Sequence, residues 1–292
     1  MKLCYYPGCT MKNAALNFEE SALYALAKLD IEVDELKKWY CCGTVFSLTT
    51  DNLIQHVGPV RNLLRVQETG NDSVMTLCAM CFNTLKRANE RMKSDPESLE
   101  KINEFMSHED TKYTGRVKVL HLLELLRDSI TFDRIAQKIE RPLHGLRVAA
   151  YYGCMLVRPQ DIGIDDQENP TVMEELLKTL GATPVEFPYK TECCGAYLTV
   201  NNPEMIVTRT HQIVGSALRQ GADVIAVACP LCAFNLDHRQ KQTAEKHLGF
   251  QNIPVVYFTQ LMAAALGGSE DDLRLDLHHV DPRPLFKEKK VI

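Results

Sequence analysis

Ten of the eleven cysteines in this chain fall into two sets of five, arranged in the same order. Each set begins with a Gly-Cys pair, continues with two adjacent cysteines followed by glycine, and ends with Cys-x-x-Cys. The sets are Cys9, Cys41, Cys42, Cys78, Cys81 and Cys154, Cys193, Cys194, Cys229, Cys232. Adjacent cysteines before a glycine place two thiols on one tight turn, an arrangement that metal or redox chemistry requires and that packing seldom does.

The two sets also agree in spacing. The first and second motifs of each set are separated by 31 residues in one copy and 38 in the other, and the second and third motifs by 35 and 34. Such self-similarity indicates an internal duplication. We therefore expect two homologous domains, residues 1–143 and 144–292, and we expect the second to end in a polar, extended arm from about residue 267 to 292.

Short apolar runs alternate with helical patterns in both halves, which predicts an α/β fold with a mostly parallel sheet in each. The expected strands are 2–6, 31–36, 72–77 and 117–120, followed by 146–152, 183–187, 223–228 and 253–257. The cysteines then fall in loops between strands and helices. Because ligands of open parallel sheets bind outside the carboxyl ends of the strands, five thiols distant in sequence can meet at one edge of each sheet.

Two helix starts can be read in the segments that follow the cysteine doublets. Asp51 is a predicted N-cap, although Gly58-Pro59 argues for a kink or break in the helix after it, and Asn202 is a predicted cap for a helix that begins at Pro203.

Composition limits the class of protein. The chain has 292 residues, is 45% hydrophobic and has a net charge of -5 with no basic stripe, which argues against nucleic acid as a partner. No apolar run approaches the roughly 18 residues of a membrane span, so we expect no direct insertion into a membrane. The first residues form no apolar leader segment, and we expect a reducing, cytoplasmic location.

Five thiols in each set exceed the four ligands of a structural zinc site, and adjacent cysteines are not the usual zinc spacing. Sites made only of thiolates otherwise suit iron-sulfur clusters. The run typical of ferredoxins, Cys-x-x-Cys-x-x-Cys, is absent, so the spacing does not suggest an ordinary cubane. From the residues alone, iron-sulfur is favoured, while zinc and a metal-free dithiol site remain open.

The doubled pattern resembles the cysteine-rich CCG domain, and the two-copy form of about this length resembles the B subunit of heterodisulfide reductase. The resemblance covers nearly the whole chain. It implies that each half holds one noncubane [4Fe-4S] cluster, and that the ten repeat cysteines are the ligands, five to each cluster.

The same resemblance implies the catalytic subunit of a heterodisulfide reductase-like complex, an oxidoreductase that cleaves a small disulfide between two clusters facing each other across a two-fold interface. It implies two partners, one ferredoxin-like and the other flavin-bearing, as further subunits of that complex. The chain has no Gly-x-Gly-x-x-Gly fingerprint, so we expect no flavin on this chain.

Two other functions stay open. The chain could be an electron-transfer subunit of a glycolate, lactate or glycerol-phosphate oxidation complex or another quinone-linked complex, because CCG repeats also occur there. It could also be a zinc-stabilised scaffold. The absence of ferredoxin motifs, which the electron-transfer subunits often contain, favours the reductase.

Three further residues could bear on the chemistry. His56 and His211 each follow a cysteine doublet on an expected helix, and either could supply protons to product thiolates as a catalytic group. Their spacings from the doublets differ by three residues, and a solvent-facing or packed histidine is the alternative. Cys4 has alanine at the matching position of the second half, which favours a buried, inert thiol over an extra ligand.

Overall fold

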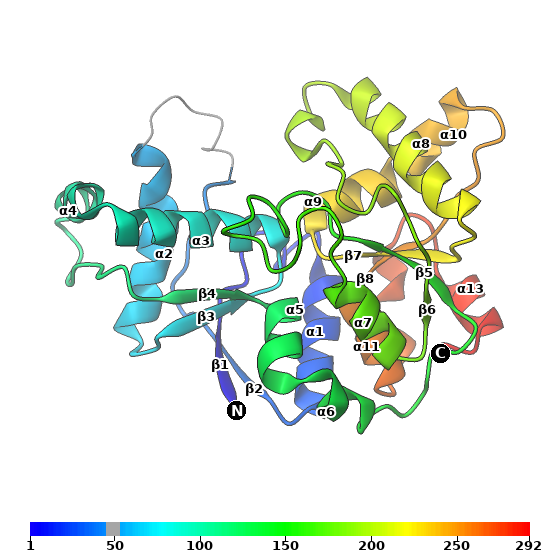
Figure 1. The fold of residues 1–292 in the computed structure, drawn as a ribbon, viewed down its shortest axis with the longest axis horizontal. Coiled ribbons are helices and arrows are strands. Elements are labelled where there is room, and N and C mark those ends of the chain that lie inside the picture. The colour runs from blue at the N-terminus through cyan, green and yellow to red at the C-terminus, as the bar shows by residue number, and fades with distance from the viewer. Residues whose placement is uncertain (45–52) are drawn as a thin grey trace.

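A computed structural model describes residues 1–44 and 53–292 (Figure 1). It contains two four-stranded sheets, with strand orders β2-β1-β3-β4 and β6-β5-β7-β8, and every strand pair is parallel. Helices flank both sheets. The α/β prediction of two parallel sheets with the same strand arrangement is confirmed.

The first half contains one sheet and its helices. Its elements are β1 (Lys2–Tyr5), α1 (Leu16–Lys28), β2 (Glu32–Glu35), the 3₁₀ turn η2 (Ile54–His56), α2 (Val57–Glu68), β3 (Ser73–Thr76), α3 (Ala79–Ser94), α4 (Pro96–Phe105), β4 (Lys118–His121), α5 (Leu122–Leu125), the π turn η3 (Leu126–Ile130) and α6 (Phe132–Ala136).

The second half repeats this order. Its elements are β5 (Arg147–Tyr151), α7 (Val172–Thr179), β6 (Thr183–Pro184), η4 (Ala196–Leu198), α8 (Pro203–Arg219), β7 (Val224–Val227), α9 (Pro230–Ala233), the π turn η5 (Phe234–His238), α10 (Gln240–Lys246), β8 (Val255–Tyr257), α11 (Phe258–Ala265), α12 (Glu270–Leu273), η6 (Leu275–Leu277) and α13 (Arg283–Glu288).

Local sequence explains where two of these helices begin. The Asn202 side chain accepts a hydrogen bond from the Met205 N–H at 3.2 Å, which confirms the predicted cap of α8. The predicted cap Asp51 lies outside the described residues. Gly58 and Pro59 do not break α2, because they stand in its first turn, where proline needs no N–H partner.

The two halves pack through α1 and α11. Phe18 of α1 stacks on Tyr257 with ring centroids 4.2 Å apart, and the Ser21 hydroxyl lies 2.7 Å from that of Thr259. The buried apolar residues of both sheets form one continuous cluster rather than two separate cores. The halves are therefore joined by a hydrophobic interface. The domain boundary between residues 143 and 144 remains a prediction.

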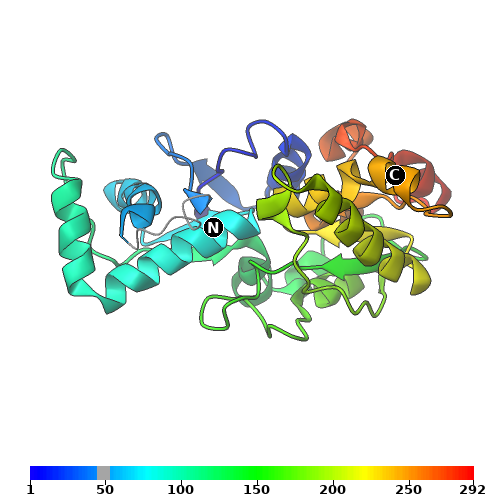
Figure 2. The same cartoon turned by 90° about the horizontal axis from the view of Figure 1, so that it is seen from above.

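The segment 267–292 is folded, so the expectation of an extended arm is wrong. It contains α12 and α13, and α12 lies against α1 of the first half (Figure 2). Leu273 and Phe286 are fully buried. Arg274 makes an ion pair with Glu20 of α1 at 3.0 Å. A few apolar anchors fix this segment to both halves although most of its residues are polar.

Within residues 1–44 and 53–292, no helix is both long enough and apolar enough to cross a membrane.

Candidate metal centre

The repeat cysteines lie where the sheets end, and most of them contact one another. In the first half, Cys41 and Cys42, Cys42 and Cys81, and Cys81 and Cys78 lie close enough to change each other's pKa. Cys9 lies close to Cys41. The cysteines of the first set therefore lie together at one edge of their sheet, as the sequence predicts.

The second half has a similar but not identical set of interactions. The Cys194 and Cys232 sulfurs are 3.5 Å apart, Cys232 contacts Cys229, and Cys154 contacts Cys193. Cys78 and Cys229 lie close enough to change each other's pKa, so the two sets approach each other where one half touches the other. The thiols therefore form a path that crosses the interface between the halves, with matching cysteines on either side of it.

Neighbouring thiols differ in how readily they ionise. Hydrogen bonds from Cys41 and Cys81 lower the pKa of Cys42 to about 4, and a hydrogen bond from Cys154 lowers the pKa of Cys193 to about 6. The pKa values of Cys41 and Cys154 are raised, chiefly because each donates to such a neighbour. Both halves thus contain an easily formed thiolate, which is the form that binds metals.

A glycine makes room beside the sulfurs in each half. At Gly8, with φ +74°, an added Cβ would stand 2.9 Å from the Cys81 sulfur, and at Gly153, with φ +65°, 3.1 Å from the Cys232 sulfur. No residue with a side chain fits these positions without displacing a sulfur or straining the backbone. The donor set and this space together fit a thiolate-ligated group larger than a single atom.

Among the described residues, no three His, Cys, Asp or Glu side chains converge in the geometry of a single metal ion.

Two tyrosines anchor the doublets, a role that the sequence reasoning missed. Tyr6 and Tyr151 are fully buried, and each precedes the Gly-Cys cysteine by three residues. The Tyr6 hydroxyl donates to the Tyr40 carbonyl at 2.7 Å, and the Tyr151 hydroxyl donates to the Glu192 carbonyl at 2.6 Å. Those carbonyls immediately precede the doublets. The repeated Tyr-x-x-Cys spacing was the available signal.

We expect Tyr6→Phe to destabilise the fold by about 1 kcal/mol, because one hydrogen bond is lost, and to speed the release of metal from the first half. Tyr5→Phe is the matched control, since the neighbouring buried Tyr5 hydroxyl bonds to Glu19 instead of the doublet. Thermal melting and the rate of metal transfer to a chelator measure the two effects. Equal release rates in both variants would contradict the anchoring role.

The two Cys-x-x-Cys loops meet asymmetrically. The Ala79 N–H donates to the Ala228 carbonyl at 3.2 Å across the interface. The matching residue in the other loop is Pro230, which has no N–H to return the bond. The Leu77 carbonyl is instead bonded by His121 Nε2 at 2.8 Å, and burial lowers the pKa of His121 to about 4. A neutral, buried histidine thus replaces the hydrogen bond that proline cannot make.

His56 and His211 lie in different places in the structure and do not contact each other. His56 ends the turn before α2, where burial and then Arg91 and Arg87 lower its pKa. His211 lies on α8 and stacks on His247 with ring centroids 3.9 Å apart. A catalytic role for either histidine stays a prediction.

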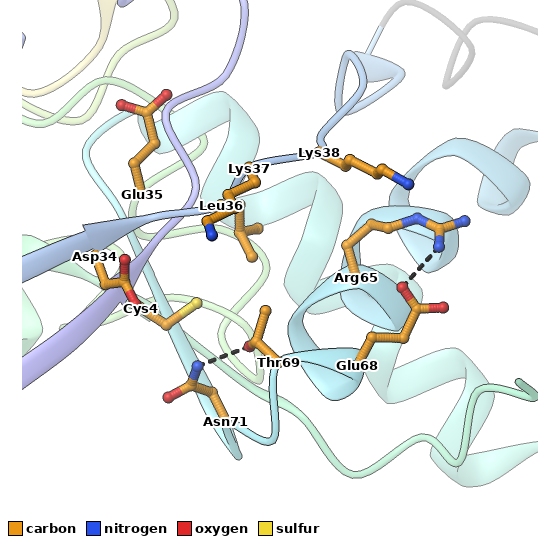
Figure 3. Close-up of a pocket in the computed structure, with 10 residues that line it drawn as sticks. All are labelled: Cys4, Asp34, Glu35, Leu36, Lys37, Lys38, Arg65, Glu68, Thr69 and Asn71. Atoms are coloured by element: carbon orange, nitrogen blue, oxygen red, sulfur yellow. Dashed lines mark hydrogen bonds and ion pairs between the residues drawn. The ribbon is translucent and has the colours of Figure 1, made fainter.

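Cys4 stands apart from the ten repeat cysteines. Its buried thiol lies at a pocket of about 330 Å³ lined by charged residues of the β2 and α2 segments, including Asp34, Lys37 and Arg65 (Figure 3). Burial, and then Asp34, raise the pKa of Cys4 to about 11. A protonated thiol at this position is a poor metal ligand and a poor nucleophile.

Fold and site together define a class: a duplicated parallel α/β protein that gathers five cysteines at each sheet and joins the two sets across an interface. The chain belongs to the cysteine-rich CCG domain family, which matches residues 3–86 and 148–237.

Relatives of known name span nearly the same length. The chain is 30% identical to the 8-methylmenaquinol:fumarate reductase membrane anchor subunit of Wolinella succinogenes, over 97% of this chain and 99% of that protein. It is also 30% identical to the B subunit of the ferredoxin/F420H2-dependent CoB-CoM heterodisulfide reductase of Methanosarcina acetivorans, over 94% and 92% respectively. The resemblance to the B subunit of heterodisulfide reductase therefore extends over most of the chain.

One solved structure has the same fold. A hypothetical protein from Helicobacter pylori superposes with a TM-score of 0.78 at 14% identity, over 95% of this chain and 51% of that one.

Proposed function

We propose that this chain is the catalytic subunit of a heterodisulfide reductase-like complex and that it reduces a disulfide bound between its two halves. The observation that supports this most directly is the path of thiols through Cys78 and Cys229, which brings two equivalent cysteine sets to one interface. A two-electron cleavage needs two one-electron carriers close to one substrate, and a duplicated cysteine domain supplies two such places.

Two noncubane [4Fe-4S] clusters would be held by the two sets. The first would use Cys9, Cys41, Cys42, Cys78 and Cys81, and the second would use Cys154, Cys193, Cys194, Cys229 and Cys232. When bound, such clusters supply single electrons to the sulfur-sulfur bond. Five thiols in each half, and the space left by Gly8 and Gly153, support this assignment.

The chain's own residues hold this arrangement rigid. Tyr6 and Tyr151 fix the turns that contain the doublets. The packing of α1 against α11 fixes the distance between the halves. Burial excludes water from the sulfurs of Cys78 and Cys229, which limits unwanted oxidation or protonation there.

Electrons would arrive from a ferredoxin-like partner, which itself receives them from a flavin-bearing partner of the same complex. The names of the Methanosarcina relatives describe the B subunits of heterodisulfide reductases, and this supports partner subunits of that kind.

A second function is favoured by a separate observation. The relative from Wolinella succinogenes, matched over nearly its whole length, is named as a subunit of a fumarate reductase that uses 8-methylmenaquinol. The alternative is therefore an electron-transfer iron-sulfur subunit of a quinone-linked complex, in which the clusters pass electrons and no disulfide is cleaved.

The first test is the iron, acid-labile sulfide and zinc content of protein purified without oxygen, followed by reduction of a panel of small disulfides with a reduced viologen dye. We expect about eight irons per chain, as two four-iron clusters require, and disulfide-dependent oxidation of the dye. Eight irons without disulfide cleavage would favour the electron-transfer alternative. One or two zinc ions without iron would contradict both.

A further inference from the structure

A cavity of about 160 Å³ lies between the two halves, next to the cysteine sets. Thr10, the residue after Cys9, lines it from the first half. Leu231, which lies between Cys229 and Cys232, lines it from the second. A ligand in this cavity would therefore touch loops that hold cysteines of both sets.

The third wall of the cavity is formed by the C-terminal segment through Leu277, His278 and His279. Phe234 and Asp237, which belong to the π turn η5, also line the cavity. At the matching position of the first half, after its Cys-x-x-Cys, α3 continues as an unbroken helix. π turns are rare and often mark functional positions.

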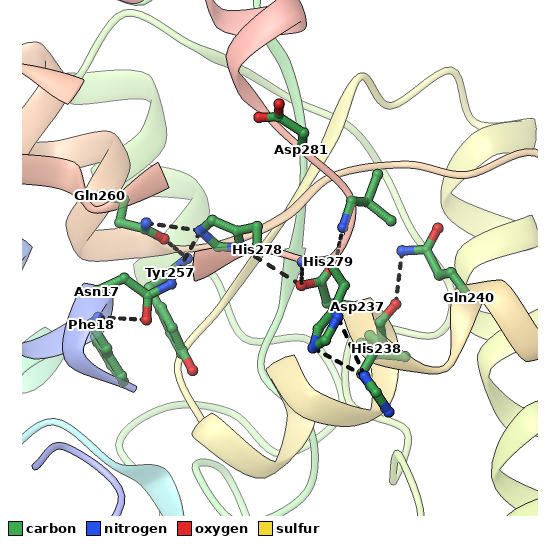
Figure 4. A network of polar contacts seen from close by, with 12 residues as sticks. Asn17, Phe18, Asp237, His238, Gln240, Tyr257, Gln260, His278, His279 and Asp281 are labelled. Carbon is green, nitrogen blue, oxygen red and sulfur yellow. Dashed lines mark hydrogen bonds and ion pairs between the residues drawn. The ribbon is translucent and has the colours of Figure 1, made fainter. Parts of the chain in front are cut away.

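His278 cannot give a proton to a ligand through Nε2, because two amide groups bond to this nitrogen (Figure 4). Gln260 Oε1 accepts from the Tyr257 N–H, so its amide nitrogen must donate, both to the Leu273 carbonyl at 2.7 Å and to His278 Nε2 at 2.9 Å. Asn17 Nδ2 lies 3.2 Å from the same Nε2. Because Nε2 faces two donors, it is an acceptor without a proton.

Asp237 is also engaged. Its carboxylate accepts backbone hydrogen bonds from His279 at 2.8 Å and Val280 at 2.9 Å, and it lies 3.8 Å from His278 Nδ1. These bonds fasten the C-terminal segment to the π turn and hold His279 at the cavity. Asp237 therefore positions the C-terminal segment at the cavity, and we do not assign it the role of proton donor.

His279 lines the cavity and is also exposed to solvent. His238 Nδ1 lies 3.0 Å from His279 Nε2, and Phe234 stacks on the His238 ring. Burial, His279 and Arg239 lower the pKa of His238, while Asp237 opposes them. Two imidazoles at hydrogen-bond distance can share one proton, and His279 is exposed at its outer side.

The cavity selects an uncharged ligand. Within the part of the chain that the structure describes, no lysine or arginine lines it, and its remaining wall includes Ala14, Leu231, Ala233 and Phe234. An anionic group would find no lysine or arginine there among the described residues, whereas a sulfur-sulfur bond between two short carbon chains matches both the apolar wall and the volume.

We propose that this cavity binds the disulfide end of the substrate and that His279 is the catalytic residue that protonates one product sulfur, regaining its proton from solvent while His238 positions its ring. The inference rests on the proposed function and deepens it. Cleavage breaks one S–S bond and forms two S–H bonds. It takes up two protons and two electrons, which a protein donor delivers one at a time. His279 supplies one proton and water the other.

The test compares His279→Gln, His238→Gln and the control His247→Gln in the full chain with its clusters, using bis(2-hydroxyethyl) disulfide and reduced methyl viologen. We expect His279→Gln to lower kcat about 100-fold, within the range of general acid catalysis, with little change in KM. His238→Gln should lose less, and His247→Gln, in a histidine pair remote from the cavity, nothing.

A second measurement does not depend on turnover. Carbethoxylation of histidines with diethyl pyrocarbonate, followed by mass spectrometry, should be slowed at His279 by the disulfide and unchanged at His247. Iron content and melting temperature establish that each variant is folded.

A His279→Gln rate within about twofold of wild type would overturn the inference, as would unchanged modification of His279 in the presence of the disulfide. Failure of the proposed function is seen separately, because wild-type protein with full iron would then cleave no disulfide.

Discussion

Replacing Cys42 with serine is expected to remove about half of the iron and all disulfide cleavage, because a serine hydroxyl stays protonated where the thiolate binds metal. Cys42 is only 2% exposed and contacts both Cys41 and Cys81, so no solvent ligand can take its place. Cys194→Ser should have the same effect on the second set, because Cys194 is equally buried and lies 3.5 Å from Cys232.

Cys4→Ser is the matched control for these two variants. It is also a buried cysteine, but it lies in β1 away from the thiol path, so iron and activity should stay at wild-type levels. Iron and sulfide analysis, electron paramagnetic resonance and the viologen assay measure the outcome. If Cys42→Ser or Cys194→Ser kept full iron and activity, the ligand assignment of that cysteine would be wrong.

Replacing Gly8 with alanine should have the second largest effect, the loss of the metal group of the first half. Alanine at φ +74° costs about 1–2 kcal/mol in backbone conformation, and its Cβ would also stand 2.9 Å from the Cys81 sulfur. Because that sulfur must move, its geometry as a ligand is lost. Gly153→Ala should act in the same way on Cys232 and the second half.

Two other glycines separate backbone strain from contact with sulfur. Gly70, at φ +77°, and Gly145, at φ +81°, have no atom within 4 Å of an added Cβ. Gly70→Ala and Gly145→Ala should therefore lower the melting temperature but keep full iron. Equal iron loss in Gly8→Ala and Gly70→Ala would show that strain alone, and not the space beside Cys81, governs metal binding.

The sheets could be predicted from the sequence because both depend on local patterns. Apolar runs such as Val224–Val227 are long enough to be buried strands, and their alternation with helices implies parallel pairing. The strand expected at residues 183–187 is only two residues long. Pro184 has no N–H, and a strand at the sheet edge with proline extends poorly.

The cysteine sites could be located because thiols repeated in register are rare. The anchoring of the doublets by Tyr6 and Tyr151 could not be foreseen from composition, because a buried tyrosine in a strand has the same sequence signature whether or not its hydroxyl reaches a distant carbonyl. His238 and His279 are 41 residues apart. Only the π turn and the bonds of Asp237 bring them together, and neither has a local pattern.

The fold of the C-terminal segment could not be foreseen for a related reason. Its average polarity hides buried apolar side chains, among them Leu273, Leu275, Phe286 and Val291. Isolated apolar residues at irregular spacing produce no helical or strand period, so periodicity cannot detect them.

The position of this segment also affects how the protein is made. Residues 270–291 are synthesised after both sheets, yet they complete the cavity wall and clasp α1 of the first half. Domains fold in order as the chain emerges from the ribosome. Both sheets can thus form before this segment docks, so the last wall of the cavity is added after the loops that hold the cysteines.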